Sequence, residues 1–262
     1  MWGIVVPVLA FLLAASAFAG WIDAVIGGGG LVLIPVLMSA TAMPAASVLA
    51  TNKVAAISGT ASAAAALVRR VGVPKRTWAY AFIAGVAAAL GARAVSRIDD
   101  SVATPIILIL LVGVGIFVAL NPRFGQEGAG VVTGRRVALG ALCAVAIGAY
   151  DGVFGPGTGM FLIMAFTAVF TQGFVRSAAM SKVVNTATNL GALLVFGLGG
   201  FINWKLALAL AAANVVGAQL GARTCSRAAP RWCGWRSLGS SSRYVRSWAG
   251  IYSRVSEPLA RP

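Results

Sequence analysis

The sequence predicts an all-α, polytopic membrane protein built from two inverted-topology repeats, each with a short broken helix after a glycine-rich motif. Composition is the first observation behind this class: 59% of the 262 residues are hydrophobic and 10% are charged, whereas soluble domains carry about 25% charged residues. Long apolar runs are the second, and recurrence of the motifs of the first half in the second half is the third. The composition argues against a soluble enzyme, a disulfide-stapled secreted domain and a disordered chain.

Apolar runs predict nine helical segments, two of them short. A helix needs about 20 apolar residues to cross a bilayer. In chain order the segments are Gly3–Ile26, Leu31–Ala42, Ser47–Val68, Trp78–Val95, Val102–Leu120, Val137–Phe154, Met160–Phe170, Ala178–Leu198 and Trp204–Ala222. The first is expected to be a retained span and not a cleaved signal peptide, because the motif that follows it recurs later in the chain.

The distribution of charge orients these segments. The most basic short loop, residues 69–76, is placed in the cytoplasm. The linker 121–136 is then cytoplasmic as well, while the gap 97–101, with two aspartates, and the N-terminus lie outside. The net charge of +15 comes from loops and the tail. No basic stripe with interleaved aromatics occurs, so no nucleic-acid binding is expected.

Three blocks of sequence recur at a nearly constant offset, which indicates a tandem duplication. Residues 20–29 match 148–157 at an offset of 128, residues 51–54 match 180–183 at 129, and residues 91–93 match 221–223 at 130. The basic loop around Arg70 corresponds to the uncharged residues 199–203, and the neutral turn around Pro44 to a turn with Arg176. This swap of charge bias favours inverted repeats. An odd number of crossings per half agrees if both short segments cross; re-entrant short segments would make the halves parallel.

The predicted organisation has four parts. Residues 1–120 form the first membrane repeat, 121–136 the cytoplasmic linker, 137–223 a second repeat that lacks its last span, and 224–262 a tail rich in Arg and Ser. The abrupt change of composition suggests that a frameshift replaced the last helix. A genuine basic tail lying on anionic lipid is the alternative.

Candidate substrate-binding residues gather at the two glycine breaks and on the long helices that follow them. Transporters with inverted repeats bind substrate where helices break near the midplane. Main-chain N–H groups at Leu31 and Met160, at the start of the short helices, could cradle an anion there, although the breaks could also be plain tight turns. The candidates are Gly28, Gly29, Asn52, Lys53, Gly157, Thr158, Lys182, Asn185 and Asn189.

Four charged residues are predicted inside the membrane: Asp23 and Asp151 just before the breaks, and Lys53 and Lys182 after them. A charge there costs at least ~2.5–3.5 kcal/mol, so these side chains should face the interior. Three interpretations stay open. The lysines attract an anion while one of the aspartates couples transport to protons, or each aspartate pairs with a lysine and ties helices together, or the lysines reach an interface. The chain has no His and no Cys-x-x-Cys, so no catalytic residue, metal or cofactor is expected.

The duplicated block resembles the sulfite exporter TauE/SafE family of membrane permeases over about residues 3–223. The resemblance rests on Asp23 before glycines 27–30, Pro35 and residues 51–53, and on their second-half counterparts Asp151, residues 155–159 and residues 181–185. It implies a multi-pass secondary permease of the plasma (inner) membrane that exports sulfite, sulfonate or a related small sulfur-containing anion. A membrane scaffold or assembly subunit is the alternative. The expected partners are the anion and the lipid bilayer, with a homo-oligomer left open.

Overall fold

The computed structural model describes residues 2–99, 101–102, 105–109, 112–113, 116 and 132–239, and the side chains among these from residue 7 to residue 224. Most of the predicted segment 102–120, the linker 121–131 and the tail from residue 240 lie outside the described residues. The chain divides into two units, residues 1–224 and 225–262. The contacts described below lie within the first unit, and the frameshift hypothesis for the tail stays a prediction.

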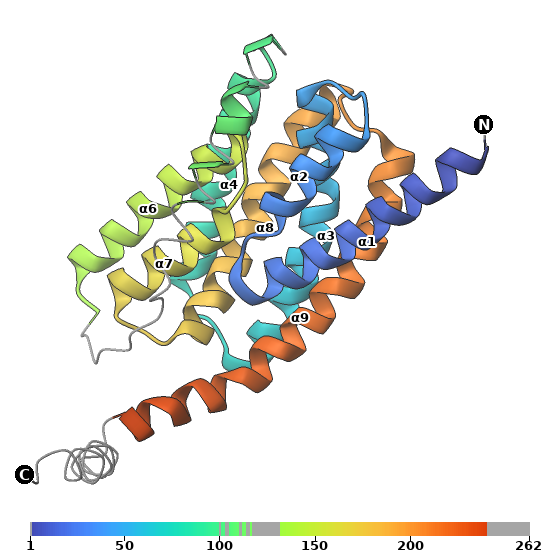
Figure 1. Ribbon diagram of the computed structural model, residues 1–262. Helices are drawn as coiled ribbons and strands as arrows, with labels where there is room; N and C mark the ends of the chain where they lie inside the picture. Colours follow the sequence, from blue (N-terminus) through green and yellow to red (C-terminus); the bar gives the residue numbers. More distant parts are fainter. Residues whose placement is uncertain are drawn as a thin grey trace, which may run out of the picture. The chain divides into compact units, whose positions relative to one another are not determined.

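Every helix or strand that the structure describes is an α-helix, which confirms the predicted all-α class. The helices are α1 (Trp2–Ile26), α2 (Gly29–Ala40), α3 (Ala45–Val71), α4 (Arg76–Val95), α6 (Gly134–Val153), α7 (Thr158–Phe170), α8 (Phe174–Leu198) and α9 (Trp204–Gly239), and they are labelled in Figure 1.

Within the described residues, five helices are long and apolar enough to cross a membrane, namely α1, α3, α4, α6 and α9 up to Thr224. Large apolar side chains such as Phe82, Leu142 and Leu194 are 60% or more exposed, so lipid is the solvent that suits this surface. α8 has 25 residues but is not among the five. Its middle carries buried polar side chains that face the protein interior.

Each short helix is the second arm of a helical hairpin. The start of α2 lies against α1, because a Cβ atom at Gly29 would be 2.7 Å from the backbone oxygen of Ala19. Figure 1 shows α2 turning back from the end of α1. α7 likewise returns along α6, since the ring of Phe170 at its end would lie 2.7 Å from a Cβ atom at Gly140 near the start of α6. In each repeat a long helix and a short helix thus form a hairpin. Whether the short helices cross the bilayer or re-enter stays a prediction.

The two long helices α3 and α8, which are counterparts in the duplication, run antiparallel. Leu67 near the end of α3 packs with Ala178 near the start of α8, and Val48 near the start of α3 belongs to the apolar cluster of Phe196 near the end of α8. Antiparallel counterparts are what the predicted inversion requires of this pair.

The two repeats exchange helices. α4 of the first repeat packs against α6 and α8 of the second, and α9 of the second packs against α1 of the first. The contacts correspond under the duplication: a Cβ atom at Gly148 would lie 2.6 Å from the backbone oxygen of Ala84, and one at Gly20 would lie 2.2 Å from that of Asn214. Glycine at each crossing lets the two backbones touch. Neither repeat could therefore form its core alone.

Substitution at one of these crossings should destabilise the protein. A Cβ atom at Gly217 would lie 1.7 Å from the backbone oxygen of Ala17, so α9 must move away from α1 in Gly217→Ala. We expect a loss of about 1–3 kcal/mol, measured as a lower midpoint of thermal unfolding in detergent. Gly134→Ala is the control, because a Cβ atom there meets nothing within 4 Å. Equal midpoints for the two variants would contradict the close crossing.

Candidate functional site

The two glycine breaks meet each other inside the protein. Gly27 and Gly155, which are counterparts at an offset of 128, both have positive φ angles, +87° and +89°, a conformation that favours glycine. A Cβ atom at Gly27 would lie 2.4 Å from the backbone of Gly159, so only glycine fits at this contact. The N–H of Met160 donates a hydrogen bond to the carbonyl oxygen of Gly27 at 3.1 Å. The tips of the two hairpins, one from each repeat, are therefore joined through their backbones.

This contact uses one of the main-chain amides that were predicted to cradle an anion at the starts of the short helices. The N–H of Met160 is already bonded to Gly27, and the N–H of Leu31 donates to the carbonyl oxygen of Gly28 at 3.0 Å. In this conformation both amides are satisfied within the protein, so neither faces an anion.

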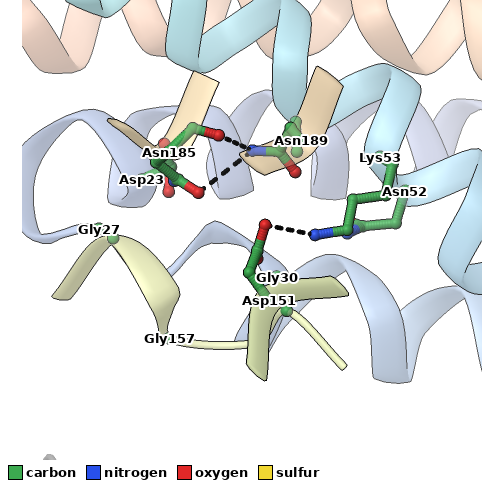
Figure 2. Close-up of a pocket in the computed structure, with 12 residues that line it drawn as sticks. Asp23, Gly27, Gly30, Asn52, Lys53, Asp151, Gly157, Asn185 and Asn189 are labelled. Carbon is green, nitrogen blue, oxygen red and sulfur yellow. Dashed lines mark hydrogen bonds and ion pairs between the residues drawn. The ribbon is translucent and has the colours of Figure 1, made fainter. Parts of the chain in front are cut away.

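Two buried ion pairs link the repeats reciprocally. Lys53 of α3 pairs with Asp151 of α6, with 2.8 Å between Nζ and Oδ2. Lys182 of α8 pairs with Asp23 of α1, with 2.6 Å between Nζ of the lysine and Oδ2 of the aspartate. Each lysine therefore reaches the aspartate of the other repeat. The first of these pairs is drawn in Figure 2.

The lysines are among the most buried side chains of the protein. The exposed fraction is 2% for Lys53 and 0% for Lys182, so the interpretation in which they extend to a membrane interface is wrong. A charge at such a position is tolerated only with a partner of opposite sign. The reciprocal pairs supply these partners.

A small polar cavity lies between the two pairs and the hairpin tips. Its volume is about 20 Å³, which is room for about one water molecule. No side chain that lines it is both apolar and larger than alanine. The lining residues are Asp23, Gly27, Gly30, Asn52, Lys53, Ala56, Asp151, Gly155, Gly157, Gly159, Asn185 and Asn189, and Figure 2 shows most of them around the space.

Most of the candidate residues gather at this cavity. Asp23, Asn52, Lys53, Asp151, Gly157, Asn185 and Asn189 line it. Lys182 and Thr158 do not, but each contacts a lining aspartate: Lys182 pairs with Asp23, and the hydroxyl of Thr158 donates to Oδ1 of Asp151 at 2.7 Å. Gly28 and Gly29 do not line it either; they belong to the first hairpin.

Sequence reasoning did not place five lining residues in the site: Gly27, Gly30, Ala56, Gly155 and Gly159. The four glycines belong to the predicted breaks, 27–30 and 155–159, so the duplication carries a signal for them. The candidates rest on polar side chains and on other glycines of the same breaks. Gly159 also has a side-chain contact: its carbonyl oxygen accepts a hydrogen bond from Ser181 of α8 at 2.7 Å, which holds the second hairpin tip on α8.

The asparagines of α8 form one wall of the cavity. The side-chain amide of Asn189 donates to the backbone oxygen of Asn185 at 2.8 Å and lies 3.2 Å from its Oδ1. Figure 2 shows the two side chains turned toward each other above the hairpin tips. These amides and the lysines put hydrogen-bond donors beside the cavity, which is the chemistry an oxyanion needs.

The reciprocal pairing predicts a non-additive effect of neutralising one pair. Lys53→Met leaves Asp151 buried without its partner and should cost about 3–5 kcal/mol. Lys53→Met combined with Asp151→Asn removes both charges and should recover much of that loss. Thermal unfolding midpoints of the wild type, both single variants and the double variant measure the coupling. Strictly additive shifts would contradict a direct interaction between the two repeats here.

The sequence is similar to one protein family and to several proteins named as probable membrane transporters. Residues 12–237 match the family described as "Sulfite exporter TauE/SafE". The chain is 34% identical over 224 residues to a "Probable membrane transporter protein" of Haemophilus influenzae, covering 83% of this chain and 85% of the relative. It is also 34% identical over 216 residues to "Probable membrane transporter protein ORF9" of Sinorhizobium sp, covering 82% of each. The "Probable membrane transporter protein YfcA" of Escherichia coli K12 is 34% identical over 222 residues, with 82% and 80% covered. No solved structure matches.

Proposed function

We propose that the protein exports a small sulfur-containing anion. The premise is that the chain belongs to the sulfite exporter TauE/SafE family of membrane transporters. The proposed substrates are sulfite, a sulfonate or a related anion, and the proposed location is the plasma (inner) membrane. Transport is secondary, with no catalytic residue. One observation carries this proposal: two buried lysines, each paired with an aspartate of the other repeat, stand beside a polar cavity at the joined helix breaks.

Charge balance at the cavity supports a mechanism. Two lysines and two aspartates make the site neutral overall. An anion that binds beside a lysine competes with the aspartate already paired there, and the displaced carboxylate would be a buried, unpaired charge. Protonation of that carboxyl group removes the conflict. A proton and one negative charge of the substrate are then bound together, and they cross the membrane in the same direction.

The size of the cavity supports a closed conformation. A volume of about 20 Å³ is too small for an anion of several non-hydrogen atoms, since one water already fills it. The joined tips, held by the bond from Met160 to Gly27, stand in its wall. In transporters with inverted repeats, access alternates as one repeat moves against the other around a fixed site. Separation of the hairpin tips is the movement that would enlarge the cavity here.

Flux measurements test the proposal. Purified protein in proteoliposomes should move labelled sulfite faster when a pH gradient drives protons in the same direction. Lys182→Ala should reduce this flux to background, because it removes a cation beside the cavity. Lys205→Ala is the matched control: it also removes a lysine, but an exposed one at the start of α9, and it should keep most of the flux.

Two outcomes would contradict the proposal. Sulfite and sulfonate flux that is equally fast in Lys182→Ala and in the wild type would exclude the site. No flux of any sulfur anion in a well-folded wild-type protein would favour the alternative, a membrane scaffold or assembly subunit. In a scaffold, neutralising Lys182 should leave complex formation in the membrane intact.

A further inference from the structure

The two ion pairs are counterparts in the duplication, but they differ in how firmly each carboxylate is held. Asp151 accepts a hydrogen bond on Oδ1 from the hydroxyl of Thr158, at 2.7 Å, in addition to its ion pair with Lys53. The residue that corresponds to Thr158 at the offset of 128 is Gly30. Glycine has no side chain to donate, so Asp23 has no such hydroxyl beside it.

The backbone at the breaks adds a second difference. Gly155 lies directly on the Lys53–Asp151 pair: a Cβ atom there would be 3.0 Å from Nζ of Lys53 and 3.2 Å from Oδ1 of Asp151. Its counterpart Gly27 has nearly the same φ angle but faces the backbone of Gly159 instead. The glycine after the break thus lies on the ion pair itself at Lys53–Asp151, whereas the first hairpin touches Asp23 through Gly29, where a Cβ atom would be 2.8 Å from Cβ of Asp23.

The lysines differ as well. Lys182 donates both to the carboxylate of Asp23 and to the backbone carbonyl oxygen of the same residue. If the carboxylate leaves, that carbonyl oxygen still accepts from the ammonium group. In the part of the chain that the structure describes, the ion-pair partner of Lys53 is Asp151 alone. Loss of the carboxylate costs less at Lys182 than at Lys53.

The two aspartates also differ in how much of each side chain is exposed. The exposed fraction is 14% for Asp23 and 2% for Asp151, so water reaches only the first to a useful extent. The charged groups that face Asp23 are Lys182 from α8 and, across the cavity, Lys53 from α3 and Asp151 from α6. The short helices α2 and α7 contribute no titratable side chain. From α9, Arg223 follows Gly221, which packs against Trp21 and Ala24 of α1, so this guanidinium is a further charged group to be counted near Asp23, whereas Lys205 lies at the other end of the helix.

We infer that the aspartates of the two repeats differ in function. Asp23 is the carboxyl group that gains and loses the proton, while Asp151 stays ionised in a fixed pair with Lys53. Thr158 is the positioning residue that holds Asp151. Because position 30 is glycine and offers no such hydroxyl, the carboxylate of Asp23 can separate from Lys182. This inference rests on the proposed function. It narrows the proton-coupling role, predicted for both aspartates, to one.

Carbodiimide labelling tests the inference without any transported substrate. Dicyclohexylcarbodiimide modifies carboxyl groups that take up a proton in apolar surroundings, and mass spectrometry of peptides separates Asp23 from Asp151. In the full-length protein in nanodiscs, Asp23 should be modified several-fold more than Asp151, and more at pH 6 than at pH 8. Excess modification of Asp151, or equal modification of both, would overturn the inference.

Matched variants test the roles of positions 30 and 158. Gly30→Thr should reduce modification of Asp23 to near the level of Asp151, because the new hydroxyl can donate to the carboxylate. Gly30→Ala adds bulk alone and should label like the wild type; a Cβ atom there meets only ordinary contacts, the nearest at 3.4 Å. Thr158→Val should raise modification of Asp151, and Thr158→Ser, which keeps the hydroxyl, should restore the low level. Identical labelling in Gly30→Thr and Gly30→Ala would overturn the role assigned to position 30.

The labelling separates this inference from the proposed function. Asymmetric labelling in a protein that moves no anion would leave the inference about Asp23 standing and remove the transport role. Anion flux with equal labelling of both aspartates would support the transport role and overturn the inference about Asp23.

Discussion

The structure depends on two lysine–aspartate pairs that each join one repeat to the other. Four ionisable groups at the centre of an apolar protein are tolerated only when they are paired, and here no repeat contains both members of a pair. The first repeat supplies Lys53 to Asp151 and receives Lys182 at Asp23. Both repeats must therefore be in place before either can bury its charges. The exchange of α4 and α9 between the repeats imposes the same condition on their apolar cores.

The contacts between the two hairpin tips are also those that the proposed transport would have to break. The hairpin tips touch at Gly27 and Gly159, where no Cβ atom fits, and Met160 ties them with a backbone hydrogen bond. A single hydrogen bond contributes about 0.5–1.5 kcal/mol net, so the tips can separate at modest cost. An anion bound beside a lysine and a proton bound to an aspartate would together take the place of the ion pair between those two residues. Stability and function thus draw on one small set of groups.

Much of the site could be predicted from sequence because a duplication marks what it repeats. Asp23 and Asp151, Lys53 and Lys182, and the glycine breaks recur at matching positions, and charged residues in apolar runs must face inward. Pairing partners could not be predicted, because Asp23 lies on a different helix from both lysines and only the exchange between repeats selects Lys182. Whether each short segment crosses or re-enters stayed open for a related reason: an apolar run of 12 residues has the same pattern in both cases. The bond between the tips, from Met160 to Gly27, could not be predicted either, because it joins segments that are far apart in the sequence.

Proton uptake on anion binding is the most direct test of the central claim that an anion takes the place of a carboxylate at a buried lysine. Titrating sulfite into the detergent-solubilised protein by calorimetry, in two buffers of different ionisation enthalpy, counts the protons bound per anion after correction for protonation of sulfite itself. We expect uptake of about one proton per bound sulfite, taken up by the carboxylate that the anion displaces. Saturable sulfite binding with no proton uptake would contradict it, because the anion would then bind while both pairs stay intact.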